Sequence, residues 1–231
     1  MKRAKIFQAL NYWPTYLLLK FFVRFEVRGQ ENLRGLENEA IILTSNHCSW
    51  FDGPIAAASL PRASLFPKKF FPIRFLVMER FFHWKYLAIA AYIRLNGSIK
   101  VPKGARRDTI LKDAIVALKS GDKIWVYPEG GWDDKNQGRM RRGRKGVVFL
   151  HRATGAKIVP VGIIGNYGLL HPRTLLRKNK VVVNIGKPIV NLDDSGSCTL
   201  EDGVETVMAR IQDLIDTPAA LNPCSSASIR G

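Results

Sequence analysis

Residues 40–54 read AIILTSNHCSWFDGP and combine an apolar run, a polar loop and the start of a helix. The short apolar run Ala40–Thr44 predicts a buried strand. Gly53-Pro54 predicts the first turn of a helix. His47 and Asp52 therefore lie in a strand-to-helix loop at the carboxyl end of a strand, where active sites tend to form in open α/β sheets.

The same alternation of strand and helix patterns continues on both sides of this stretch. β-rich runs occur at Phe25–Val27, Ala40–Thr44, Phe75–Met78, Ser98–Val101, Lys123–Tyr127, Lys157–Ile164 and Lys180–Ile185. Helical patterns occur near Pro54–Leu60, Arg80–Ala91, Asp108–Lys119, Lys145–Thr154 and Leu200–Ile215. Such alternation predicts an α/β fold with a mixed, largely parallel sheet flanked by helices.

The two ends of the chain differ from its middle. Residues 4–24 are rich in aromatic and aliphatic side chains flanked by basic ones, which is typical of an amphipathic membrane-anchoring helix. A first helix that docks on the core fits this composition equally well. A bilayer crossing needs about 20 apolar residues, and this stretch is interrupted by Gln8, Asn11 and Pro14. We expect a membrane-interacting helix over 1–24, one domain over 25–217 and a disordered tail over 218–231.

The chain of 231 residues is strongly basic. Thirty-six Lys and Arg against 19 Asp and Glu give a net charge of +17, which favours a polyanionic partner. Nucleic acid is the less favoured partner, because the aromatic residues cluster near the N-terminus and do not alternate with the basic ones. Cys48, Cys198 and Cys224 lack the spacing of a metal site or a disulfide framework, so a reducing compartment is expected.

His47 and Asp52 have the spacing of a general-base dyad. A carboxylate in this position can accept the Nδ1 proton of the imidazole, so that Nε2 can take a proton from a hydroxyl. Two other interpretations remain: Asp52 caps the following helix, and His47 is an ordinary hydrogen-bonded loop residue. Activation of Cys48 or Ser49 as a nucleophile is less favoured, because neither lies in a nucleophile elbow.

A second polar group follows the predicted strand Lys123–Tyr127. Glu129 is presented on a turn whose glycines, Gly130 and Gly131, allow close approach of the backbone to a ligand. An ordinary strand-end turn explains the same residues equally well.

Basic residues follow two of the predicted strands. Lys100 and Lys103 follow Gly97-Ser-Ile99 at the end of one of them, and the cluster Arg139–Lys145 comes after the Glu129 turn. A solvated face is the usual explanation of a charge run, but here both groups would lie near the dyad and could bind phosphate. In another strand, Pro160 predicts an edge strand or a bulge.

Taken in order, four blocks resemble those of the glycerolipid acyltransferase family, whose best-known members are 1-acyl-glycerol-3-phosphate acyltransferases. The N-H-x4-D block matches Asn46–Asp52, and the second block matches Gly97–Lys103. The F-P-E-G block matches Tyr127–Trp132, and the V-P-V block matches Val159–Val161. The resemblance covers about residues 20–190.

The resemblance implies an enzyme of phospholipid biosynthesis. His47, held by Asp52, would deprotonate a glycerol hydroxyl that attacks the thioester of acyl-CoA or acyl-carrier protein, giving phosphatidate. It implies no metal and no redox cofactor, and association with the cytoplasmic face of a membrane. The residues expected to bind substrate are Asn46, Lys103, Glu129, Gly130, Gly131, Arg144, Lys145 and Pro160.

Two departures from the family pattern leave the acceptor open. Lys103 stands where the family usually has arginine, and Gly131-Trp132 stands where it usually has threonine followed by arginine or serine. Either Arg139, Arg141, Arg144 or Lys145 replaces the missing side chain, or the acceptor is another lysolipid, such as a lysophospholipid or an acylated amino lipid. A non-catalytic protein that binds anionic surfaces is the remaining alternative.

Overall fold

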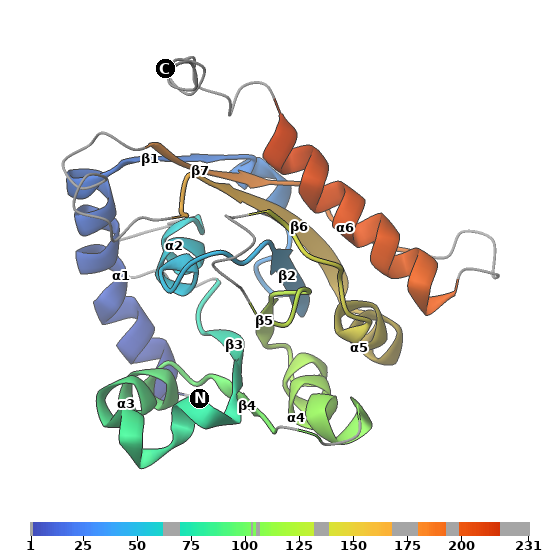
Figure 1. Ribbon diagram of the computed structural model, residues 1–231, viewed down its shortest axis with the longest axis horizontal. Helices are drawn as coiled ribbons and strands as arrows, with labels where there is room; N and C mark the ends of the chain where they lie inside the picture. Colours follow the sequence, from blue (N-terminus) through green and yellow to red (C-terminus); the bar gives the residue numbers. More distant parts are fainter. Residues whose placement is uncertain are drawn as a thin grey trace, which may run out of the picture.

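The computed structural model describes residues 2–61, 70–102, 104, 107–131, 139–167, 180–192 and 199–217. Its strands form one seven-stranded sheet in the order β1-β7-β6-β2-β5-β3-β4 (Figure 1). All neighbouring strands are parallel except β6 and β7, which confirms the predicted fold class. The strands are β1 (Arg24–Arg28), β2 (Ile41–Ser45), β3 (Ile73–Met78), β4 (Ile99–Val101), β5 (Lys123–Val126), β6 (Lys157–Ile164) and β7 (Lys180–Ile185).

Helices cover both faces of the sheet. They are α1 (Lys2–Phe22), α2 (Asp52–Ala58), α3 (Leu87–Leu95), α4 (Arg107–Lys119), α5 (Gly146–Thr154) and α6 (Leu200–Asp216), with 3₁₀ turns η1 (Gln30–Leu33), η2 (Glu79–Phe82) and η3 (Trp84–Tyr86). Helices α1 and α2 pack into the hydrophobic core on one face, and α4, α5 and α6 pack into the core on the other (Figure 1).

Strand β2 is the centre of the sheet, with β6 on one side and β5 on the other. All five of its residues are buried, as expected for a strand covered on both faces. Because side chains alternate along a strand, Ile41 and Leu43 enter the core under α1 and α2, whereas Ile42 enters the core under α4, α5 and α6. The loop after β2 therefore starts at the middle of the sheet edge.

The placement of Pro160 at an edge strand is wrong, because β6 is an inner strand between β7 and β2. The carbonyl of Pro160 accepts a hydrogen bond from the Gly186 N–H at 2.8 Å. The N–H that proline lacks would point the same way, toward the segment where the chain leaves β7. Regular pairing of β6 with β7 begins only at Val161, so the proline removes no regular rung.

The single helix predicted over Arg80–Ala91 is also wrong. Two 3₁₀ turns precede α3, and His83 between them has an extended backbone with ψ 151°. The His83 ring accepts the Lys85 N–H, a local bond that competes with helical pairing.

Helix α1 docks on the domain by one face only. Tyr12 is buried, and the buried Gln8 amide donates to the carbonyls of Ile73 and Asn96 and accepts the Ile73 N–H. The core-docking interpretation therefore holds for this face, while membrane contact stays a prediction for the other. Large apolar side chains are exposed on α1 at Ile6, Leu10, Leu17, Leu18 and Phe21.

In the part of the chain that the structure describes, no helix has the length and apolar character needed to cross a bilayer. The predicted disordered tail, 218–231, lies outside the described residues.

Candidate active site

The structure brings His47 and Asp52 together beyond the carboxyl end of β2. The imidazole Nδ1 lies 2.7 Å from Asp52 Oδ2. Asp52 is fully buried, whereas the His47 side chain keeps some exposure to solvent. An Asp52 oxygen that accepts the Nδ1 proton fixes the tautomer, so Nε2 becomes the nitrogen that can take a proton.

Four further donors converge on the Asp52 carboxylate. Oδ2 accepts the backbone N–H groups of Cys48 at 2.7 Å and Ser49 at 3.0 Å. Oδ1 accepts the Ser49 hydroxyl and the Asn166 amide, both at 2.6 Å. A buried carboxylate requires such donors, because burial removes its hydration. The helix-cap interpretation fails, since the N-cap residue of α2 is Phe51, which makes no capping bond.

Asn46 makes a positioning contact in the structure. Its side-chain Nδ2 donates to the Ile163 carbonyl and its Oδ1 accepts the Ile163 N–H, both at 2.8 Å. The amide thus continues the pairing of β2 with β6 by one side-chain rung. Both ends of this buried amide bond to the backbone, so Asn46 holds the loop in place, and its contact with substrate stays a prediction.

Glu129 connects the loop that holds His47 to the segment that holds Arg141. Oε1 accepts the His47 N–H and Oε2 accepts the Arg141 N–H, both at 2.8 Å. Burial raises the pKa of the Glu129 carboxyl, while the two backbone donors and the Arg141 guanidinium oppose that rise. Glu129 therefore sets the position of two backbone segments, one of which carries His47.

Tyr127 supports the imidazole from one side. Its ring stacks on the His47 ring with centroids 4.1 Å apart and an interplanar angle of 16°. The Tyr127 hydroxyl is buried and has no hydrogen-bond partner among the described residues. Burial, followed by the nearby Asp52 charge, raises the Tyr127 pKa well above its usual value.

Sequence reasoning missed two supporting residues. Tyr127 was recognised as part of the block Tyr127–Trp132, but its contact with His47 was not predicted. Nothing in an apolar strand indicates which ring will lie beside a distant histidine. Asn166 follows β6 at Gly165-Asn166, and this turn-forming pair at a strand end was its only signal.

The structure argues against covalent catalysis by Cys48 or Ser49. Burial raises the pKa of the Cys48 thiol, and the Asp52 and Glu129 carboxylates raise it further, which disfavours the reactive thiolate. The Ser49 hydroxyl directs its proton to Asp52 and accepts the Phe51 N–H at 3.1 Å. Both residues thus build the loop around the dyad.

The Arg144 guanidinium lies against the glycine turn after β5. Gly130 has φ 71°, and a Cβ at this position would lie 2.6 Å from the Arg144 Nε. The backbone N–H of Arg144 also donates a hydrogen bond to the Pro128 carbonyl at 2.8 Å. The carbonyl of Gly131 accepts from the Arg141 guanidinium. The absence of a side chain at Gly130 therefore leaves room for the exposed Arg144 side chain.

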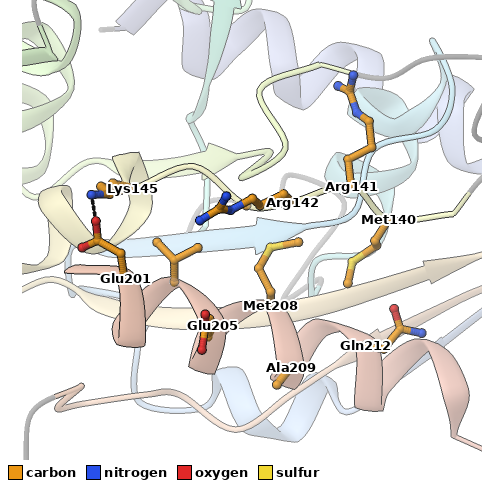
Figure 2. Close-up of a pocket in the computed structure, with 11 residues that line it drawn as sticks. Met140, Arg141, Arg142, Lys145, Glu201, Glu205, Met208, Ala209 and Gln212 are labelled. Atoms are coloured by element: carbon orange, nitrogen blue, oxygen red, sulfur yellow. Dashed lines mark ion pairs between the residues drawn. The ribbon is translucent and has the colours of Figure 1, made fainter. Parts of the chain in front are cut away.

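Lys145 makes a different contact from the one predicted. Its ammonium pairs with Glu201 of α6, along a groove of about 460 Å³ between this helix and residues 140–145 (Figure 2). Met140 and Met208 form apolar parts of the groove, and Arg142 forms a basic part. Lys145, directly before α5, thus has an ion-pair partner on α6, and its contact with substrate stays a prediction.

The remaining predicted residues fall into three groups. Lys103 and Trp132 lie outside the described residues. Lys100 pairs with Glu79 at 3.0 Å on the surface, and Arg139 is exposed. Pro160 is buried beside Thr44 of β2, within the sheet that supports the loop.

The chain is similar to known proteins over most of its length. Residues 24–164 match the family model described as Acyltransferase. The curated 1-acyl-sn-glycerol-3-phosphate acyltransferase LPAT1 of Arabidopsis thaliana, a chloroplastic protein, is 25% identical over 191 residues. The match covers 80% of this chain and 47% of that protein, so the chain spans about half the length of this relative.

A solved structure shares the fold. The crystal structure of PlsC from Thermotoga maritima, a 1-acyl-sn-glycerophosphate acyltransferase, matches with a TM-score of 0.68 and 22% sequence identity. The match covers 96% of this chain and 80% of that one.

Proposed function

This chain belongs to the acyltransferase family, and from that premise we propose that it acylates the free glycerol hydroxyl of 1-acyl-glycerol-3-phosphate. The donor is a fatty acyl thioester, acyl-CoA or acyl-carrier protein, and the product is phosphatidate. The observation that carries the proposal is the 2.7 Å contact between His47 Nδ1 and Asp52 Oδ2 at the centre of the sheet edge.

The proposed reaction needs one base and no acyl-enzyme. His47 Nε2 takes the hydroxyl proton while the hydroxyl oxygen bonds to the thioester carbonyl carbon. The carbon–sulfur bond then breaks, and the departing thiolate receives the proton from His47. Asp52 holds the tautomer and stabilises the transient imidazolium, and the Tyr127 ring limits tilting of the imidazole. No step calls for a metal or a redox cofactor.

Arg144 supports a phosphate-bearing acceptor. Its guanidinium packs against Gly130, directly after Glu129, and is exposed to a ligand. A guanidinium binds phosphate through two parallel hydrogen bonds, and Lys103 is the predicted second cation. The second candidate acceptor is a different lysolipid, which Gly131 favours because it lacks the side chain usual at this position.

The proposed setting is the cytoplasmic face of a membrane. The apolar side chains exposed on α1 favour an interfacial position for this helix. A lysolipid confined to the same surface meets the enzyme with part of its translational freedom already lost, which favours reaction.

The experiment is thioester consumption by the purified protein, supplied in turn with acyl-CoA and acyl-carrier protein and with a panel of lysolipids. We expect lysophosphatidate to be the preferred acceptor and His47→Ala to lower kcat by about 10²- to 10⁴-fold. His151→Ala is the matched control, since His151 is a buried histidine of α5 whose Nδ1 hydrogen-bonds to the Ala156 carbonyl.

Three outcomes would change the proposal. Full activity in His47→Ala would remove the base from the mechanism. Preference for a lysolipid without a terminal phosphate would select the second acceptor class. No thioester consumption with any donor and acceptor would favour the non-catalytic alternative.

A further inference from the structure

Helix α3 is apolar but leaves most of its surface uncovered. Arg94 is its only charged residue, and Ala90 is its only buried one. Leu87 is 71% exposed, and Trp84 in the preceding turn is 78% exposed. Single exposed apolar residues are ordinary on a protein surface, whereas a contiguous group of them marks an interaction site.

This exposed group continues onto α1. The rings of Phe7 in α1 and Tyr92 in α3 meet edge to face, with centroids 5.8 Å apart. Helix α3 lies beside the N-terminal part of α1 (Figure 1), whose exposed Ile6 and Leu10 extend the apolar area.

The group also reaches the dyad loop. Trp50, which lies between His47 and Asp52 in the chain, is 55% exposed. Its ring packs edge to face on Phe81 of η2 with centroids 5.3 Å apart. One surface thus runs from α1 across α3 and η2 to the loop that holds the base.

The charges around this surface favour an anionic bilayer. Arg80, Lys85 and Arg94 are exposed within residues 79–95, and the acidic Glu79 is paired with Lys100. Aromatic and basic side chains together are typical of segments at headgroup depth, where each basic residue adds attraction to anionic lipid. A net charge of +17 opposes contact with a second copy of the same chain.

We propose that Glu79–Leu95, here called the η2–α3 surface, is a second membrane-docking surface that contacts anionic lipid together with the outer face of α1. Contact at two places holds a protein on a bilayer more firmly than contact at one, and it also fixes orientation. Through Trp50 the η2–α3 surface brings the dyad loop to the lipid. The proposed function enters only in naming the lipid as the source of the acceptor.

The test is flotation of the full chain with vesicles of phosphatidylglycerol and phosphatidylethanolamine, beside vesicles of phosphatidylcholine. The variant Trp84→Ser/Leu87→Ser removes apolar area without changing charge. We expect it to lower the partition coefficient on anionic vesicles by about tenfold or more, since the transfer of large apolar side chains out of water favours binding to the bilayer. Wild type should bind the phosphatidylcholine vesicles more weakly.

The matched control is Val190→Ser, which changes a side chain 55% exposed beyond β7 and should leave partition unchanged. Thermal unfolding midpoints establish that every variant is folded. Unchanged partition of Trp84→Ser/Leu87→Ser, or an equal loss in Val190→Ser, would overturn the proposal. So would a dimer of the wild type in vesicle-free solution that the double variant converts to monomer.

The two proposals fail separately. Flotation uses neither donor nor acceptor, so loss of the second docking surface would leave the acyl-transfer proposal intact. Conversely, His47→Ala should float as wild type does even when it no longer consumes thioester.

Discussion

The dyad region and the η2–α3 surface depart from the ordinary distribution of side chains in opposite ways. Beyond β2 and β5 the polar side chains of Asn46, Asp52 and Glu129 are buried, and each is satisfied by several hydrogen bonds. Along α3 apolar side chains such as Leu87 are exposed. Buried polar groups and exposed apolar groups are the informative exceptions in a folded domain. Here the first exception holds the proposed base in place, and the second forms the proposed docking surface.

The largest effect is expected at the centre of the buried polar group. Asp52→Asn places an NH₂ group among donors that all point at the carboxylate, and it loses the fixed His47 tautomer. We expect kcat to fall by about 10²- to 10⁴-fold. Asp122→Asn is the matched control, since this buried carboxylate pairs with Arg74 at 3.1 Å in another part of the fold. Equal losses in the two variants would contradict a special role for Asp52.

Glu129→Gln should be the next largest change. Both carboxylate oxygens accept backbone N–H groups, so the amide nitrogen of glutamine must face one of these donors. Leaving a buried donor unsatisfied costs about 1–3 kcal/mol, which should appear as a lower free energy of unfolding in denaturant. The kcat should also fall, because the His47 backbone is released. A variant with wild-type stability and wild-type kcat would show that these two hydrogen bonds of Glu129 have no role.

The protonation of Glu129 should be visible at the two amides that it binds. Its raised pKa means that the carboxyl takes up a proton at a pH above 4.5, earlier in an acid titration than an exposed glutamate. In that range the folded state binds more protons than the unfolded state, so this group favours folding as the pH falls. The protonated acid nevertheless loses one acceptor site. We expect the amide resonances of His47 and Arg141 to shift together in an NMR titration, with a midpoint above 4.5, and a midpoint at or below it would contradict the raised pKa.

Tyr127→Phe should stabilise the protein slightly. The hydroxyl is buried and has no hydrogen-bond partner in the part of the chain that the structure describes. Removing it eliminates a desolvation penalty of about 1 kcal/mol while the ring stays on His47. The free energy of unfolding should rise, and kcat should stay within a few-fold of wild type. Tyr127→Leu, which removes the stacked ring, is the informative partner variant. A loss of stability in Tyr127→Phe would reveal an unrecognised bond to the hydroxyl.

The smallest change in stability is expected on the η2–α3 surface. Leu87→Ala removes an exposed side chain and should change the free energy of unfolding by less than about 0.5 kcal/mol. Leu150→Ala in α5, another nine-residue helix, removes a fully buried side chain and should cost about 2–5 kcal/mol. Similar losses in the two variants would show that Leu87 is covered in solution.

Local patterns in the sequence were enough to predict the strands and the contact between His47 and Asp52. Each predicted strand overlaps an observed one, because short apolar runs between turn signals describe buried strands well. Pro160 was misplaced because a sequence shows the missing N–H but not the neighbour that it would face. The break in the helix at His83 was not predicted. The helical pattern of residues 80–91 gives no sign of the hydrogen bond from the Lys85 N–H to the His83 ring.

The roles of individual site residues were harder to predict. Asn46 binds Ile163 across 117 residues of chain, and Lys145 binds Glu201 on a different helix. Such partners are set by the folded topology, so residue type and spacing do not predict them. The exposure of the α3 side chains to solvent could not be predicted from the sequence either, since an apolar helical pattern predicts burial.

The two hydrogen bonds of the Glu129 carboxylate have a consequence for inhibition. The carboxylate holds the backbone of His47 and the backbone of Arg141, and Arg141 lines the groove against α6. A compound that wedges this groove and draws Arg141 away would disturb the alignment of His47 without competing with lysolipid or thioester. Such a compound would lower the turnover rate and leave the apparent affinity for both substrates unchanged.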